Sequence, residues 1–323
     1  MRHPNPTRIA ALAVATAVTL SAAGCAGPLS GGVGSVEDAR KASAQALSPT
    51  VDASALVEEG TLTVGVVTDG SNVPYCVLDD DKAMGLDVDL GSVLADHMGL
   101  QVRFVVVNDA SAALLGKQCD VVTRIEDDGA QGATTVGDYS QTAVALFHKG
   151  EASTSALADV SGKTVGVQGD SASEAAVEGS NLGATTKTYT NLNEAFKALD
   201  AGEVDYVACD AYSGAYLAAS YDGVGLAGTL DTPTVVGVAV DSTNTALIDA
   251  VKAAWDGASR DGTYDLVRAR WLGSLPKLDE STVIQGVELD EDAKTRAASV
   301  GSEGTGEGPQ DGSTAGSNAV DGF

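Results

Sequence analysis

Short runs of β-branched residues alternate with helical segments twice along the middle of the chain, and this alternation constrains the fold more than any other feature. The first round contains strand-like segments at 61–67, 102–107 and 121–125, with helix-like segments between them. The second round begins at 164 and ends in a helical segment near 219. Strands that alternate with helices form parallel sheets with right-handed crossovers. The sequence therefore predicts an α/β protein of two similar lobes, each a mostly parallel sheet flanked by helices.

Two lobes built alike predict a ligand cleft between them. A further strand is expected at 235–240, followed by helical segments at 245–259 and 262–271. The folded part then spans about 56–273, a length that suits one domain or two small lobes.

The N-terminus has the layout of a secretory signal. Arg2 and Arg8 precede an apolar run at 9–20, which is too short to cross about 30 Å of hydrocarbon as a helix. Residues 22–25 resemble the lipobox of bacterial lipoproteins, in which the cysteine is lipidated. We therefore expect a lipoprotein signal peptide at 1–24 and lipidation at Cys25. The alternative is a plain secreted protein with an incidental cysteine.

Both flanks of the folded part are poor in bulky apolar residues. The stretch 25–55 is rich in Gly, Ser and Ala and is expected to be a flexible tether. The stretch 274–323 is acidic and then Gly- and Ser-rich, so it is expected to be a mostly disordered tail. A short helix around 290–298 is the exception that its sequence allows.

The net charge of −26 excludes the usual nucleic-acid-binding proteins. Besides Cys25 the chain has three cysteines, Cys76, Cys119 and Cys209, an odd number for an oxidising compartment. No CxxC pair or His–Cys cluster indicates a metal site. We therefore expect neither a metal nor a cofactor.

Segments spread along the folded part resemble the family 3 extracellular solute-binding proteins, the amino-acid-binding components of ABC importers. No single segment is decisive, but their number, order and spacing together are specific. The matching segments are 60–66, 74–75, 85–90, 119–122, 138–140, 162–168, 204–210, 261–264 and 270–273.

The resemblance implies a two-lobed, type II periplasmic-binding-protein-like fold. Lobe 1 would be discontinuous, at 56–142 plus 236–273, and lobe 2 would lie at 143–235 with the hinge segments. It also implies a monomer that captures a small polar solute, such as an amino acid or a related amine, by lobe closure. The monomer would sit on the outer face of the cell membrane through its lipid anchor and deliver the solute to an ABC permease.

Asp210 matches the acidic residue with which the family binds the ammonium group of its ligand. It ends a predicted strand and precedes a predicted helix, so the alternative role is that of a helix N-cap.

The carboxylate side of the expected site departs from the family. The Arg that usually follows the strand ending at Ile125 is absent, which removes a bidentate clamp for a ligand carboxylate. Arg124 is the candidate replacement. It could instead pair with Glu126 or Asp210 and fill the pocket, and the sequence leaves these alternatives open.

Four other residues complete the expected site. Asn72 stands where an aromatic residue often stacks on the ligand, and Asp69 lies beside it. Ser171 offers a hydroxyl and a backbone N–H, whereas Asp170 would repel a ligand carboxylate and is expected to be a helix N-cap. The pocket is therefore polar and rather acidic, which favours a cationic solute or one with several donors.

The matched positions also place Cys76 and Cys119 in the first lobe. A disulfide between them is an open alternative to two free thiols, and with that disulfide Cys209 would be free and buried.

Two rival functions remain at this stage. The loss of the carboxylate-binding Arg is compatible with a degenerate pair of lobes that acts as a sensor or interaction module. A dehydratase-like enzyme would use carboxylates in the cleft, but the sequence has no nucleophile triad or Gly-rich phosphate loop. We therefore expect a protein without catalytic activity.

Overall fold

The computed structural model of this chain describes residues 47–67, 71–79, 82–127, 129–150, 156–297 and 319–321. The side chains at 71–72, 78–79 and 319–321 are not part of that description. The expected signal peptide at 1–24 and the expected lipidation site, Cys25, lie outside the described residues. Within the described residues, no helix is long and apolar enough to cross a membrane.

The first sheet has the strand order β14-β5-β1-β6-β13-β7. At its centre β1 is parallel to β5 and β6, while β13 runs antiparallel to β6 and β7, and β14 antiparallel to β5. The strands are β1 (Thr61–Val66), β5 (Gln101–Val106), β6 (Val121–Glu126), β7 (Ala133–Thr142), β13 (Thr234–Asp241) and β14 (Ala319–Asp321). All six residues of β1 are buried, as expected for a central strand covered on both faces.

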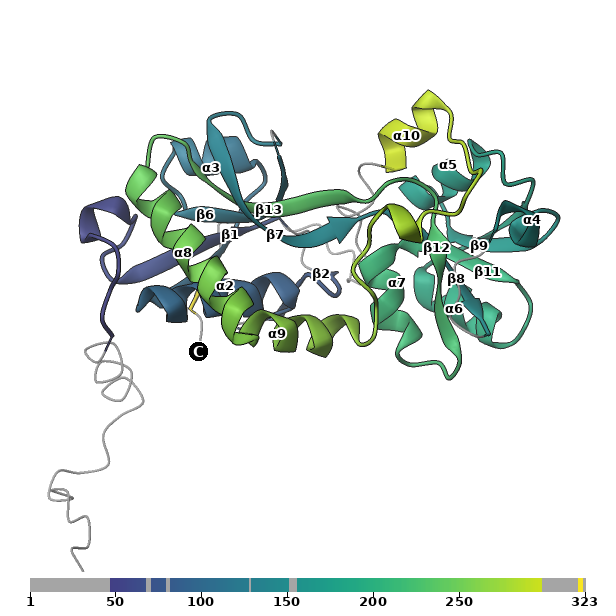
Figure 1. The fold of residues 1–323 in the computed structure, drawn as a ribbon, viewed down its shortest axis with the longest axis horizontal. Helices are drawn as coiled ribbons and strands as arrows, with labels where there is room; N and C mark the ends of the chain where they lie inside the picture. The colour runs from purple at the N-terminus through teal and green to yellow at the C-terminus, as the bar shows by residue number, and fades with distance from the viewer. Residues whose placement is uncertain are drawn as a thin grey trace, which may run out of the picture. The chain divides into compact units, whose positions relative to one another are not determined.

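Helices cover both faces of this sheet (Figure 1). Contacts join α2 (Leu86–Met98) to β1 and β5, and α8 (Thr245–Asp261) to β7 and β13. The short α3 (Ala110–Leu115) packs on β6 and β13, and α9 (Thr263–Leu272) packs on α2 and α8. Gly99 ends α2 in the left-handed conformation, which is typical of a C-cap glycine.

A small antiparallel sheet, β2-β3-β4, precedes α2. Its strands are β2 (Ser71–Asn72), β3 (Cys76–Asp79) and β4 (Lys82–Met84). The turn between β2 and β3 contains Tyr75, whose side chain is fully buried.

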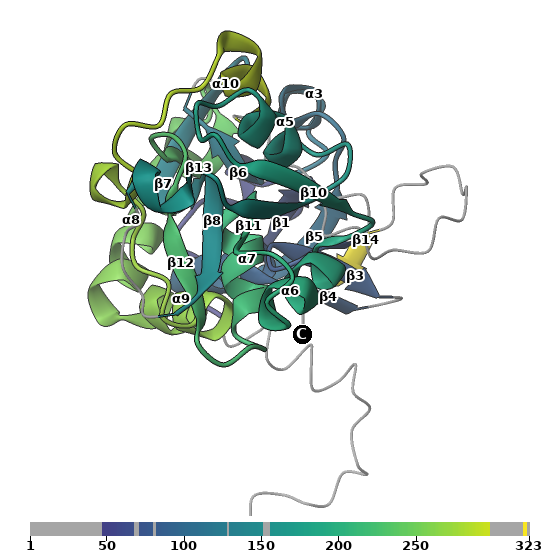
Figure 2. The ribbon, with the colours of Figure 1, turned by 90° about the vertical axis from the view of Figure 1, so that its right-hand side faces the viewer.

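The second sheet has the strand order β10-β9-β11-β8-β12. Its strands are β8 (Val144–Lys149), β9 (Thr164–Gln168), β10 (Thr185–Tyr189), β11 (Tyr206–Asp210) and β12 (Val224–Thr229). Its helices are α4 (Leu157–Val160), α5 (Ala172–Glu178), α6 (Leu192–Asp200) and α7 (Ala211–Ala218). Figure 2 shows α5 near the top of this sheet and α6 and α7 below it, next to each other.

The chain passes from the first sheet to the second at Ala143, between β7 and β8, and it returns between Thr229 and Thr234. The long antiparallel strands that flank these passages, β7, β8 and β12, are absent from the strands predicted by the sequence. They do not belong to the β-α alternation, so the pattern that revealed the parallel strands could not reveal them.

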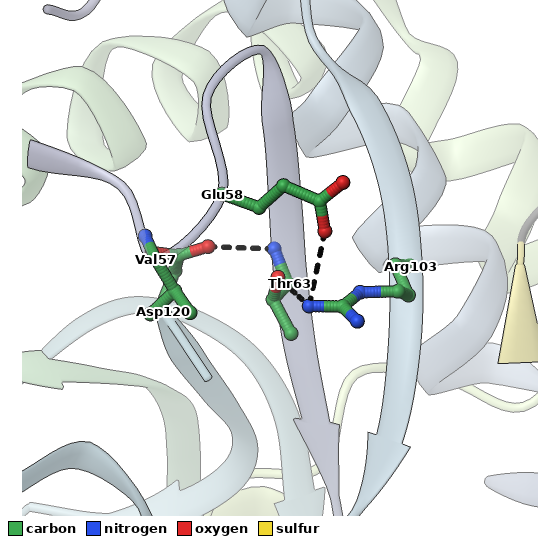
Figure 3. A network of polar contacts seen from close by, with 5 residues as sticks. All are labelled: Val57, Glu58, Thr63, Arg103 and Asp120. Atoms are coloured by element: carbon green, nitrogen blue, oxygen red, sulfur yellow. Dashed lines mark hydrogen bonds and ion pairs between the residues drawn. The ribbon is translucent and has the colours of Figure 1, made fainter. Parts of the chain in front are cut away.

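A buried carboxylate fastens the start of the first sheet (Figure 3). Asp120 accepts hydrogen bonds from the backbone N–H groups of Val57 and Thr63, both at 2.7 Å. Arg103 donates to the Thr63 hydroxyl and pairs with Glu58 at 3.2 Å. Burial raises the pKa of the Asp120 carboxyl, while these hydrogen bonds lower it. Asp120 thus ties the segment before β1 to the sheet.

The two flanks are more ordered than the sequence predicted. The expected tether, 25–55, is described from residue 47, and Thr50 donates a backbone hydrogen bond to the Met98 carbonyl. The expected disordered tail, 274–323, is described to Ala297 and contains η2 (Glu280–Thr282) and α10 (Glu291–Ala297). The expectation of disorder does not hold for 274–297, because the sparse apolar residues of this stretch are buried. Leu275 and Leu278 pack in the cluster that contains residues of both lobes, and Ile284 and Leu289 pack in the core of the second lobe. The short helix expected at 290–298 is present.

The disulfide considered for Cys76 and Cys119 is not present in the structure. Cys76, Cys119 and Cys209 are all free and buried. Cys76 belongs to the large cluster that spans α2 and the first sheet, while Cys119 belongs to the smaller cluster beneath α3. The two thiols therefore lie in different parts of the core, although both lie in the first lobe as expected.

Ile284 tests whether the segment 274–297 belongs to the folded domain. Its side chain is 0% exposed in the core of the second sheet. We predict that Ile284→Ala lowers the free energy of unfolding by about 2–4 kcal/mol, because a buried cavity replaces the side chain. The exposed neighbour Gln285 supplies the control, and Gln285→Ala should change it by less than about 0.5 kcal/mol. Urea unfolding measures the free energy of unfolding of both variants. If both substitutions change it by the same small amount, the segment 274–297 does not belong to the cooperatively folded domain.

Candidate functional site

Asp210 lies at the last position of β11 and at the N-cap of α7. Its Oδ1 accepts hydrogen bonds from the Ser213 backbone N–H at 2.8 Å and from the Ser213 hydroxyl at 2.9 Å. Tyr75 donates its hydroxyl to Oδ1 and Oδ2 of Asp210, at 3.2 and 3.3 Å. The two roles considered for Asp210 therefore do not exclude each other. One oxygen caps α7, while Oδ2 accepts only the long bond from Tyr75 among the contacts described.

Tyr75 is the centre of a stack that joins residues from both lobes. On one side its ring faces the Tyr212 ring, with centroids 5.9 Å apart and planes 13° apart. On the other side the Arg124 guanidinium carbon lies 4.2 Å from the ring centroid, a cation–π distance. Tyr212 in turn accepts a hydrogen bond from the Gln141 backbone N–H and donates one to the Gln141 side chain. The stack holds the Tyr75 hydroxyl against Asp210.

The backbone at Arg124 is unusual. Its φ is +59°, in the left-handed region that non-Gly residues adopt at a cost of about 1–2 kcal/mol. It lies in a β-bulge, since Thr123 and Arg124 together face the single residue Val238 of β13. Bulges commonly redirect a side chain next to a functional site. Here the bulge turns the guanidinium towards Tyr75, and the Arg124 side chain also donates to the Val67 carbonyl at 3.5 Å.

A second buried carboxylate, Asp87, lies in the first turn of α2 and is 2% exposed. The Tyr139 hydroxyl of β7 donates to its Oδ1 at 2.7 Å. Burial raises the pKa of Asp87, and the charge of Arg124 followed by the hydrogen bonds from Tyr139 and Thr123 lowers it. A carboxylate at a helix N-terminus is also favoured by the helix dipole.

The charges around Tyr75 do not balance. Burial raises the pKa of Asp210, while hydrogen bonds from Ser213, the charge of Arg124 and the hydrogen bond from Tyr75 lower it. Arg124 thus acts on both Asp87 and Asp210. With both carboxyls ionised, these three residues carry a net charge of −1. One additional cation beside Asp210 would neutralise the group in a medium where unpaired charge is expensive.

The remaining expected residues are not all brought to this cluster. Ser171 is the N-cap of α5, where its hydroxyl donates to the Gln168 carbonyl and accepts from the Glu174 N–H. The expectation that Asp170 caps this helix is wrong. Asp170 precedes the cap with φ +58°, and its backbone N–H donates to the Glu174 side chain.

Glu126 ends β6, and its carbonyl accepts from Thr135 and from the Gly129 N–H. Asn72 faces Cys76 in the β2–β3 hairpin, but its side chain is not described, and Asp69 lies outside the described residues. The contacts described for Asp170, Ser171 and Glu126 lie within their own lobes.

Sequence reasoning missed the residues that support Asp210. Tyr75 and Asp87 both lie in segments recognised for their resemblance, 74–75 and 85–90, but no spacing rule assigns them to one cluster. Tyr212 follows Asp210 by two residues, and its contact with Tyr75 depends on the three-dimensional arrangement of the lobes.

This arrangement can hold an ammonium group rather than perform a covalent step. Asp210 Oδ2 retains acceptor capacity, because a carboxylate oxygen accepts about two hydrogen bonds. The nearby thiols are poor nucleophiles, since burial raises the pKa of Cys76 to about 12 and that of Cys209 well above its ordinary value.

Comparison with known proteins identifies the family of this chain. The model of the bacterial extracellular solute-binding proteins, family 3, matches residues 64–274. The L-cystine-binding protein TcyJ of Escherichia coli (strain K12) is 27% identical over 226 residues, which cover 67% of this chain and 84% of that protein.

Two solved structures extend the comparison. An ancestral cationic amino acid solute binding protein is 26% identical with a TM-score of 0.55, over 66% of this chain and 96% of that one. The L-cystine solute receptor of Neisseria gonorrhoeae, in its unliganded open conformation, has a TM-score of 0.56 at 20% identity, over 69% of this chain and 95% of that one. The two-lobed α/β fold expected from the sequence is thereby confirmed.

The buried charge of Asp210 predicts a definite pH dependence. Because its pKa is raised by folding, the folded protein keeps the Asp210 proton to a higher pH than the unfolded chain does. The contribution of Asp210 to stability is therefore fully present below the unfolded-state pKa and is lost as the pH rises through the folded-state pKa. Asp210→Asn keeps a side-chain oxygen for the cap and removes this dependence.

We therefore expect the stability of Asp210→Asn, relative to the wild type, to increase from pH 4 to pH 7.5 in urea unfolding. If the stability of Asp210→Asn relative to the wild type falls over this range, the pKa of Asp210 is not raised by folding, and the assignment of Asp210 as a carboxylate whose ionisation destabilises the fold is wrong.

The backbone of Arg124 gives a matched pair of variants. Both Arg124→Gly and Arg124→Ala remove the guanidinium from Tyr75, but only Ala keeps a Cβ at φ +59°. Arg124→Gly should therefore be more stable than Arg124→Ala by about 1 kcal/mol in chemical unfolding. Equal stabilities would mean that the backbone does not hold this conformation in solution.

Proposed function

Because this chain belongs to the bacterial extracellular solute-binding proteins, family 3, we propose that it captures a small amine-bearing solute outside the cell for an ABC importer. The choice of an amine-bearing solute depends on one observation. Asp210 is buried, and its Oδ2 accepts only a long hydrogen bond from Tyr75 among the contacts described. An ammonium group there would gain a charge-assisted hydrogen bond and neutralise the net negative cluster.

The named relatives support the same chemistry. One binds L-cystine, and another is described as a binder of cationic amino acids. Both kinds of ligand carry ammonium groups. We propose an amino acid with a second cationic or amine-bearing end for this chain, because the Arg that would clamp a ligand carboxylate after β6 is absent.

Arg124 is the group that we propose to meet the ligand carboxylate. Its guanidinium is positioned by the bulge in β6 and lies on the Tyr75 ring, within the same cluster as Asp210. Asp69, Asn72, Glu126, Asp170 and Ser171 remain proposed ligand contacts.

Capture would proceed by closure of the two lobes about the passages at Ala143 and at 230–233. Closure removes water from Asp210 and strengthens its interaction with the ligand. We propose further that the protein is held at the membrane by lipid on Cys25, in line with the lipobox-like sequence at 22–25, and that it acts as a monomer without catalytic activity.

A thermal-shift panel tests this function on the chain that follows Cys25. L-arginine, L-lysine and L-cystine are compared with their N-acetylated forms, which lack the α-ammonium charge. A ligand at a hundred times its dissociation constant adds about 2.7 kcal/mol of stability. For a domain of this size that raises the melting temperature by roughly 5–11 °C.

Asp210→Asn should abolish the shift while the exposed control Asp222→Asn retains it. A shift that survives in Asp210→Asn, or that is equal for the N-acetylated compounds, would rule out Asp210 as the ammonium site. If none of the free amino acids raises the melting temperature, the result would favour a sensor or interaction module instead.

A further inference from the structure

The chain continues in an ordered form beyond the part that defines its family. The family model ends at residue 274, whereas the structure describes the chain to Ala297 and packs it against the second sheet. We call residues 273–297 the strap.

The strap starts on the first lobe. It leaves the end of α9 at Leu272, and the side chain of Arg268, in α9, donates to the Pro276 carbonyl at 2.9 Å. Leu275 and Leu278 are buried, at 7% and 2% exposed, in the apolar cluster that contains residues of both lobes. A cavity of about 260 Å³ lies here, lined by Leu275, Pro276 and the small residues of α7 and β12.

The strap then attaches to the second lobe at the end of β12. Val283 forms a parallel bridge with Thr229, and the Ile284 N–H donates to the Thr229 carbonyl at 2.9 Å. Gly228 makes this approach possible, because a Cβ on it would lie 2.6 Å from the Ile284 side chain. Thr229 is also the last residue before the chain returns to the first sheet.

A second attachment fixes the far end of the strap. The Asn181 side chain donates to the Gly286 carbonyl at 2.9 Å and accepts from the Glu288 N–H at 2.8 Å. Beyond it, α10 packs on α5 with Ala293 and Ala297 buried. Figure 1 shows this yellow-green segment leaving α9 and reaching α10 beside α5.

The strap is therefore a third connection between the lobes, covalent where it leaves α9 and noncovalent where it attaches to the second lobe. The other two are the passage at Ala143 and the return at 230–233, and the strap lies against the second of these at Thr229. Lobes joined by two short segments bend freely about them. A third segment that is anchored on both lobes removes part of that freedom, because its ends move with different lobes.

We propose that the strap restrains the opening of the lobes, so that the unliganded protein samples a narrower range of inter-lobe distances than two connections alone would allow. For a binding protein this restraint lowers the conformational cost of closure and slows ligand release. That consequence rests on the proposed function, whereas the restraint itself does not require a ligand.

The test slackens the strap without removing its anchors. Six Gly/Ser residues are inserted after the exposed Lys277, between the buried Leu275 and Leu278. The matched control carries the same insertion after Gly304, beyond the strap. Spin labels on cysteines placed at the exposed Gln118 of lobe 1 and Asp222 of lobe 2 report the inter-lobe distance by pulsed electron resonance, in the full chain after Cys25 without ligand.

We expect the Lys277 insertion to broaden the distance distribution at least twofold in width, while the Gly304 insertion leaves it unchanged. Unchanged widths in both would overturn the proposal. If the protein with the Lys277 insertion fails to fold, a protease site is placed at the same position and cut after folding. A cut protein with the same distance distribution as the uncut protein would also overturn the proposal. The thermal-shift panel reports separately on solute binding, so failure of the strap and failure of the proposed function are distinguishable.

Discussion

A carboxylate held away from water needs several donors or an opposite charge, and Asp210 finds both in groups from the two lobes. Ser213 supplies the donors of its own helix, Tyr75 brings a hydroxyl across from the first lobe, and Arg124 brings charge. The rest of the site follows from this requirement. The bulge in β6, the left-handed backbone at Arg124 and the Tyr75–Tyr212 stack together place one guanidinium where two buried carboxylates need it. The guanidinium and the two carboxylates carry a net charge of −1 when both carboxyls are ionised, and the proposed ligand ammonium would neutralise it.

This charge arrangement suits the proposed binding function better than it suits acid–base catalysis. An acid–base enzyme needs a carboxyl that exchanges protons with substrate, whereas Asp87 and Asp210 are both engaged in capping or in hydrogen bonds with tyrosines. A buried carboxylate that is poorly compensated without ligand favours whatever cation can reach it. Functional sites commonly contain residues that lower the folding stability of the protein, as a buried and poorly compensated carboxylate does. The third connection between the lobes fits the same scheme, because a restrained cleft presents Asp210 to the ligand with less reorganisation.

Most of the parallel framework could be predicted from the sequence, because its strands and helices follow local periodicity. The helix Ala110–Leu115, capped by Asp109, lies between the second and third predicted strands, where the alternation predicts a helix. The antiparallel strands β7, β8 and β12 could not be predicted, since their pairing joins segments that are far apart in the sequence, such as Val224 with Lys149 and Asp241 with Ala133. The strap was mistaken for disordered tail, because its apolar residues are isolated in an acidic stretch. Ile284 and Leu289 are buried in the core of the second lobe, and Leu275 is buried in the cluster that contains residues of both lobes. Asp210 and Arg124 were expected in the site from the sequence, whereas Tyr75, which contacts both in the structure, was not.

The most direct test of the central claim is a crystal structure of the protein with L-arginine or L-cystine bound. The account predicts that the ligand α-ammonium nitrogen lies about 2.7–3.2 Å from Asp210 Oδ2 and that Tyr75 keeps its hydroxyl on the same carboxylate. A bound amino acid whose ammonium group contacts other residues, with Asp210 still enclosed by Ser213 and Tyr75 alone, would contradict it.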